Sequence, residues 1–121
     1  MQKVEDMTEI TCKFDDVSNG FINIYKVLDN ELHRSDVFIP FLNAMLKLQA
    51  SISFAKNAKD TENEAAAIAL DSITAVGEQV SMMAKSNLVA ESLTKPMIHD
   101  CKTLSSMIEA YIEENKSLSQ V

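Results

Sequence analysis

The sequence has few of the residues that interrupt helices, crosslink chains or anchor them in a bilayer. Its 121 residues include two glycines, two prolines, two cysteines and no tryptophan. No uninterrupted apolar run approaches the length of a membrane span. Scarce glycine and proline with abundant Ala, Leu, Met, Glu and Lys are typical of α-helical chains. Because 121 residues suffice for one modest core, we expect a single all-α domain over residues 1–121.

Basic clusters are also missing, and the formal net charge is −7. Nucleic acid is therefore an unsuitable partner, since its phosphates require clustered Lys and Arg. Whole-chain electrostatics likewise oppose an anionic membrane, which this chain would have to bind through shape or through a partner. The first ten residues contain no apolar segment of the kind found in secretory signals. We expect a cytoplasmic protein, or one on the cytosolic face of a membrane.

Motifs for catalysis or metal binding are absent from the sequence. Cys12 and Cys101 form no C-x-x-C pair, and no E-x-x-H spacing or glycine-rich phosphate loop occurs. The surroundings of His33 lack the small-residue pattern of histidine phosphotransfer domains. His99 and Cys101 are two residues apart, so on a helix they would not face each other. We predict a non-enzymatic protein with no cofactor, no metal and free thiols.

Apolar residues recur at alternating spacings of three and four throughout the first half, as in a coiled coil. The pattern continues through Asn19-Gly20, where a helical glycine costs only about 1 kcal/mol relative to alanine. It predicts one helical path over residues 5–58. Pro40 and the polar segment 34–36 leave open a break near residue 35, with the proline in the first turn of a new helix. The stripe is Met7, Ile10, Phe14, Val17, Phe21, Ile24 and Leu28, continued by Phe38, Leu42, Met45 and Ile52.

The clearest boundary lies at the middle of the chain. Thr61 and Glu64 have the spacing of a capping box, and acidic residues suit the first turn of a helix. Lys56 and Lys59 precede them, where the end of the previous helix favours positive charge. We predict a turn at residues 58–61.

The second half, residues 62–118, has the same periodicity, and its phase is unchanged on either side of Pro96. The shared phase favours a single helix bent at Pro96, which would lose one backbone hydrogen bond there. Thr94 capping a new helix, with Pro96 in its first turn, remains the alternative.

Two architectures fit these stripes. The first is a long antiparallel helical hairpin that dimerises into a four-helix assembly, because apolar residues beside the stripe need a second surface. The second is a compact monomeric four-helix bundle with turns near 35, 60 and 94. The residues predicted to form the helix seam and to mediate self-association are Phe14, Phe21, Ile24, Leu28, Phe38, Leu42, Met45, Ile73, Val76, Val80, Met83, Met97, Leu104, Ile108 and Tyr111.

The pattern also resembles a known family. The second half, with its aliphatic stripe, the A-x-x-L turn at Ala90–Leu93 and the pair Pro96-Met97, is similar to the second long helix of BAR-superfamily domains. The segment GFINIYKVLDNELHRSDVFIPFL is similar in character to the first BAR helix. The resemblance implies a dimer of long, kinked, antiparallel helices that shapes or senses curved membranes, with lysines and arginines facing lipid.

We therefore expect a helical scaffold or interaction protein, a BAR-like homodimer associated with membrane shaping or trafficking. The alternative is an acidic cytosolic four-helix adaptor that binds a protein partner, in the manner of an immunity protein, a secretion chaperone or an inhibitor. The expected partners are a second copy of the chain, another protein, or both, with a membrane surface as a further candidate and nucleic acid excluded.

Overall fold

The computed structural model describes residues 7–28, 36, 38–57 and 63–119. For residues 117–119 it describes the backbone only. Within this part of the chain every regular element is a helix, which confirms the all-α prediction. This outcome follows because glycine and proline, which interrupt helices, are few and because apolar residues recur at spacings of three and four. The helices are α1 (Thr8–Val27), α2 (Phe38–Asn57), α3 (Glu64–Lys85) and α4 (Glu91–Ser119).

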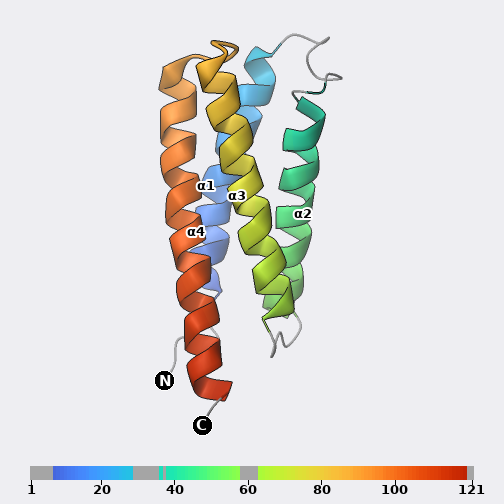
Figure 1. Ribbon diagram of the computed structural model, residues 1–121, viewed down its shortest axis with the longest axis vertical. Coiled ribbons are helices and arrows are strands. Elements are labelled where there is room, and N and C mark those ends of the chain that lie inside the picture. Colours follow the sequence, from blue (N-terminus) through green and yellow to red (C-terminus); the bar gives the residue numbers. More distant parts are fainter. Residues whose placement is uncertain (1–6, 29–35, 37, 58–62, 120–121) are drawn as a thin grey trace.

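The four helices form an up-and-down bundle in which neighbours in the chain run antiparallel (Figure 1). Helix α3 packs against α2 on one side and α4 on the other, and α4 also packs against α1. Aromatic rings connect α1 to α2: the Phe21 centroid lies 5.7 Å from that of Phe38 and 4.8 Å from that of Phe41. Tyr25 and Phe38 add a third pair at 5.6 Å. The compact four-helix arrangement is thus the one that the chain adopts.

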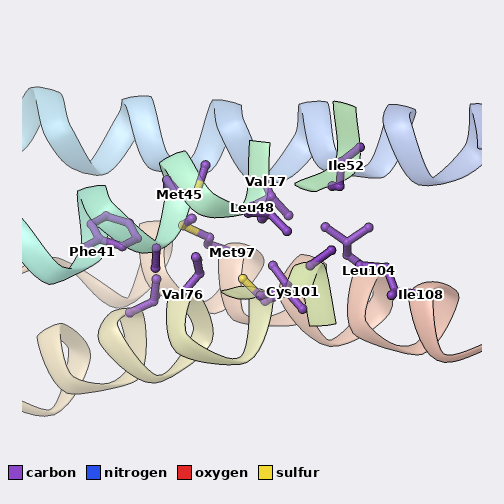
Figure 2. Packing of buried hydrophobic residues seen from close by; sticks show 14 of the residues in the cluster. Val17, Phe41, Met45, Leu48, Ile52, Val76, Met97, Cys101, Leu104 and Ile108 are labelled. Atoms are coloured by element: carbon purple, nitrogen blue, oxygen red, sulfur yellow. The ribbon is translucent and has the colours of Figure 1, made fainter. Parts of the chain in front are cut away.

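The core lies on the common axis of the bundle, where buried side chains from all four helices meet (Figure 2). The three–four repeat places one stripe of each helix on this axis, so burial of the stripes supplies most of the driving force for folding. The largest fully buried side chains are Phe41, Ile24, Leu48, Ile73, Met83, Met97, Leu104, Ile108, Val17, Val76, Val80 and Thr94.

The prediction of two continuous helical halves is wrong, because each half contains two helices. In the first half α1 ends at Val27 and α2 begins at Phe38, and the predicted break near residue 35 lies outside the described residues. The predicted turn at 58–61 and Thr61 of the capping box also lie outside them. Helix α3 begins at Glu64, after Asn63, which has a positive φ of 59°.

In the second half the chain reverses at residues 86–90, ahead of Pro96. Asn87 has a φ of 59°, its amide donates to the Ala84 carbonyl, and the Leu88 amide donates to the Met83 carbonyl. These two bonds, with a left-handed residue just past the helix end, define a Schellman motif. Asparagine adopts this conformation more readily than other non-glycine residues. The turn predicted near 94 is therefore displaced toward the N-terminus.

Pro96 lies inside α4, six residues into the helix. The predictions of a bend in one continuous second-half helix, and of a new helix capped by Thr94, are both wrong. Thr94 instead belongs to the first turns of α4 and is fully buried, with its hydroxyl lacking a hydrogen-bond partner in the structure. The apolar residues before and after residues 86–90 have the same heptad phase by coincidence, because the chain reverses between them.

Candidate functional site: the outer face of α2

The residues predicted for self-association lie mainly in the interior of this single chain. Eleven of the fifteen are buried, and the other four are partly buried against the same core. Their apolar character is thus satisfied by neighbouring helices of the same chain. The buried members are Ile24, Leu28, Phe38, Met45, Ile73, Val76, Val80, Met83, Met97, Leu104 and Ile108, and the partly buried ones are Phe14, Phe21, Leu42 and Tyr111.

Two polar contacts fix α4 against its neighbours. The Lys13 ammonium lies 3.3 Å from the Asp100 carboxylate of α4 and 3.2 Å from that of Asp16. Hydrogen bonds to Asp16 and then to Asp100 raise the pKa of Lys13. Nearer the C-terminal end of α4, the Asn115 amide donates to the Asn63 side-chain oxygen at 2.7 Å. Both contacts link helices to one another and belong to the scaffold.

The residues first considered for catalysis do not form a reactive pair. Cys101 is buried, whereas His99, two residues before it, is exposed, so the two side chains lie on different faces of α4. Desolvation, followed by the nearby Asp100 charge, raises the pKa of the Cys101 thiol to about 12. A thiol held in its protonated form is a poor nucleophile. Cys12 is exposed, and His33 lies outside the described residues.

Metal binding has no geometric support in the part of the chain that the structure describes. No group of three His, Cys, Asp or Glu side chains gathers there in a way that could hold an ion.

Eight large hydrophobic side chains of the described residues are exposed: three on α1, three on α2 and two on α3. Three of the eight belong to α2 itself: Ile39, Leu46 and Phe54. Phe54 is the most exposed of the eight, at 59%. The other five are Ile22, Tyr25, Val27, Ile68 and Met82. Exposed apolar side chains that gather at one place mark an interaction site more clearly than scattered ones do, and Phe54 of α2 and Ile68 of α3 line the same groove.

Helix α2 is apolar around most of its circumference. Its only charged residues are Lys47 and Lys56, and it contains no acidic residue. By length and composition it is also the one helix of the described residues that would suffice to span a membrane, although a core helix of a bundle meets the same criterion. About half of this apolar surface faces the core, and the remainder is solvent-exposed.

A groove of about 800 Å³ runs between α2 and α3, and we call it the α2–α3 groove. Its floor consists of small residues, among them Ala44, Ser51 and Ala65, which allow the two helices to approach closely. The Ser51 hydroxyl donates to the Lys47 carbonyl at 2.8 Å, so it presents no free donor to a ligand. The larger Phe54 stands on the α2 rim.

The two rims of the α2–α3 groove have opposite charge. Lys47 lies on the α2 rim, whereas Glu64 and Asp71 lie on the α3 rim beside Ile68. All three charged residues are exposed, and within the described part of the chain none forms an ion pair. The groove thus offers an apolar centre between a cationic and an anionic rim.

A second groove, of about 450 Å³, lies between α3 and α4. Its lining includes Met82, Ile98 and the buried Cys101. Of these, only Met82 is exposed. The groove between α3 and α4 therefore lacks a pair of exposed hydrophobic side chains from its two helices, which Phe54 and Ile68 provide in the α2–α3 groove.

Comparison with known proteins adds no relative: no family model, no curated protein and no solved structure matches this chain. The groove residues Phe54, Ile68, Lys47 and Asp71 were not among those singled out from the sequence. One signal in the sequence could have identified α2, namely its low content of charged residues. Two of the twenty residues from Phe38 to Asn57 are charged, whereas 24% of the residues in the whole chain are charged.

Proposed function

We propose that this protein is a non-enzymatic interaction module, an acidic four-helix adaptor whose α2–α3 groove binds an amphipathic helix of a protein partner. The observation that carries the proposal is the apolar groove with exposed Phe54 and Ile68 on its rims. Docking of an amphipathic helix into a hydrophobic groove is a recurrent mode of peptide recognition.

The spacing of the α2 residues that line the groove supports a helical ligand. Asn43, Lys47, Ala50 and Phe54 follow one another at intervals of four, three and four, so they form one straight strip along the helix. A ligand helix lying parallel to this strip would present its own side chains at the same intervals. It would extend the bundle by one element with ordinary helix–helix packing.

The charges on the rims specify which flank of the ligand helix is acidic and which is basic. A helix with an acidic flank toward Lys47 and a basic flank toward Asp71 would be complementary to both rims. Exposed charge pairs contribute little affinity but strongly affect which partner and orientation are accepted. The affinity is expected from burial of Phe54 and Ile68, because aromatic residues in apolar pockets dominate interface energetics.

The BAR-like function and a membrane role stay predictions. The continuous hairpin that the BAR resemblance implied is replaced by four separate helices, so its structural basis is weaker than that of the adaptor. The observation that bears on membranes is the apolar outer surface of α2 with lysines as its only charges. An anionic vesicle therefore belongs in the experiment as a competing ligand.

The test uses a synthetic helical peptide with leucines at three–four spacing, glutamates on one flank and lysines on the other. Titrated into isotopically labelled protein, it is expected to shift backbone resonances along the α2–α3 groove. Phe54→Asp is expected to weaken the peptide at least about tenfold, the effect of losing an interface hot spot. The matched control is Met82→Asp, which places the same charge on an exposed hydrophobic of the other groove.

The outcomes separate the alternatives. Equal loss of binding in Phe54→Asp and Met82→Asp would reject the groove as the site. Absence of shifts with the peptide, together with α2 shifts on adding vesicles of phosphatidylserine and phosphatidylcholine, would favour the membrane function. A variant that fails to fold is recognised by its circular dichroism, and Phe54→Ala then provides a milder substitution.

A further inference from the structure

We propose that a second copy of this chain packs against the α2–α3 groove, so that the grooves of the two copies face each other across a two-fold axis parallel to the helices. This inference rests on the proposed function, because it names the partner of the same groove. The reason for choosing a second copy is the charge pattern of the groove, whose rims are complementary to each other.

The groove residues pair at similar heights along the bundle. Helices α2 and α3 are antiparallel and meet at the same end, where α2 stops at Asn57 and α3 starts at Glu64 (Figure 1). Phe54 is three residues before the end of α2, and Ile68 is four residues after the start of α3. With a rise of 1.5 Å per residue, the two lie within about 2 Å of the same level.

The charged residues are nearly level as well. Lys47 is ten residues before the end of α2, and Asp71 is seven residues after the start of α3. The offset is three residues, or about 4.5 Å along the axis, which is less than one helical turn. A lysine side chain is long and flexible enough to cover this offset.

A two-fold axis along the groove exchanges the rims while keeping every height unchanged. It sets Phe54 of each copy against the partner's Ile68, and Lys47 of each copy against the partner's Asp71. Both contacts occur twice, as a two-fold interface requires. A two-fold axis across the helices would instead place α2 on the partner's α2, where Lys47 and Lys56 meet no acidic residue. The charge pattern favours the first axis.

Helix charges agree with this pairing. The net charge of α2 is +2, from Lys47 and Lys56, although the whole chain has a charge of −7. Helix α3 has a net charge of −2, from three acidic residues and Lys85. Two chains of −7 repel each other at long range, so self-association requires such local complementarity at the contact.

The experiment is a charge exchange followed by mixing, with mass measured by sedimentation equilibrium against the 13.4 kDa of one chain. The unmodified protein is expected to sediment at twice that mass. Lys47→Glu and Asp71→Lys, studied separately, each create two like-charge contacts and are expected to weaken the dimer at least tenfold. Mixed in equal amounts, the two variants regain both opposite-charge contacts and are expected to form a heterodimer.

Recovery on mixing is the decisive result, because it can arise only from a contact between chains. If Lys47 and Asp71 acted within one chain, the double variant would recover while the mixture would not, and the proposal would be overturned. Lys102→Glu, on the exposed side of α4, is the control and is expected to leave the dimer unchanged. The two rim residues are exposed, so neither substitution is expected to prevent folding.

The result also distinguishes this inference from the proposed function. A protein that is monomeric at every concentration and still binds the leucine-stripe peptide in the groove would overturn the dimer and keep the adaptor. A dimer unaffected by Phe54→Asp and by both charge variants would place self-association on another surface and overturn the inference. Loss of both peptide binding and dimerisation in Phe54→Asp is the outcome expected if the two proposals hold together.

Discussion

Helices α2 and α4 bury similar apolar stripes but differ in what they present to solvent. Helix α4 has eight charged residues, and none of its described side chains is a large exposed hydrophobic. Helix α2 has two charged residues and three large exposed hydrophobics. The stability of the bundle requires only the inner stripes. The composition of the outer face is therefore free to serve another purpose, and on α2 it is suited to a contact.

The two helices also differ in how they are held. Helix α4 packs along α1 and α3, and the ion pair between Lys13 and Asp100 and the hydrogen bond between Asn115 and Asn63 add to the contact. Helix α2 packs along α3 and meets α1 through aromatic rings near its first turn. An element with one fully packed neighbour is better placed to accept a further helix than one enclosed by two.

The largest effect is expected from a pair of leucines two residues apart on α2. Leu48 is fully buried, so Leu48→Ala is expected to lower the free energy of unfolding by about 2–5 kcal/mol. Leu46 is 53% exposed, and Leu46→Ala is expected to change it by at most about 0.5 kcal/mol. Urea denaturation followed by circular dichroism measures both. Similar losses in the two variants would show that the outer side of α2 also supports the fold.

The next effect concerns the turn that separates α3 from α4. Asn87→Ala places an alanine at a φ of 59° and is expected to cost about 1 kcal/mol of unfolding free energy. Asn87→Gly is expected to retain or slightly raise stability, because glycine adopts this conformation without strain. Thermal unfolding compares the two. If both variants lose the same stability, the side chain of Asn87 contributes through something other than its backbone conformation.

A smaller effect is expected from the two glycines that face α4. A methyl group at Gly77 would lie 3.8 Å from the Cys101 Cβ, an ordinary contact, so Gly77→Ala is expected to stabilise by about 0.5–1 kcal/mol. At Gly20 the same group would lie 3.0 Å from the Met97 Cγ, so the gain in helix propensity is offset by displacement of Met97. Equal stabilisation in Gly77→Ala and Gly20→Ala would contradict a tighter α1–α4 contact.

The smallest effect at neutral pH concerns the inner side of α4. Cys12 is expected to react with a thiol reagent in the native protein, whereas Cys101 is expected to react only on unfolding.

Since burial raises the pKa of Cys101 from 9.0 to about 12, the folded state holds the proton that the unfolded state releases between these values. Stability is therefore expected to fall between pH 9 and pH 12. Cys101→Ala, which lacks this proton, serves as the comparison. If the free energy of unfolding falls as steeply between pH 9 and pH 12 in this variant, the loss of stability does not come from the Cys101 thiol.

Much of the core was predictable from the sequence. Ile24, Val76 and Leu104 were placed on the buried stripe because helical periodicity is a local property that holds wherever the segment is helical. The reversal at residues 86–90 was missed because Asn87 falls on the same phase as the core residues around it. Asparagine at this position signals a turn less strongly than glycine does. The groove was missed because exposure of Phe54 and Ile68 depends on neighbours that are distant in sequence.

The sequence by itself determined that this protein is helical and which stripe of each helix is apolar, since both follow from propensity and from the 3.6-residue period. Only the tertiary structure decided that four helices of one chain cover those stripes, so that no partner is needed to bury them. It also decided that one side of α2 is left facing solvent beside α3. That outcome depends on the packing of all four helices, because a bundle can enclose only the sides that face its common axis.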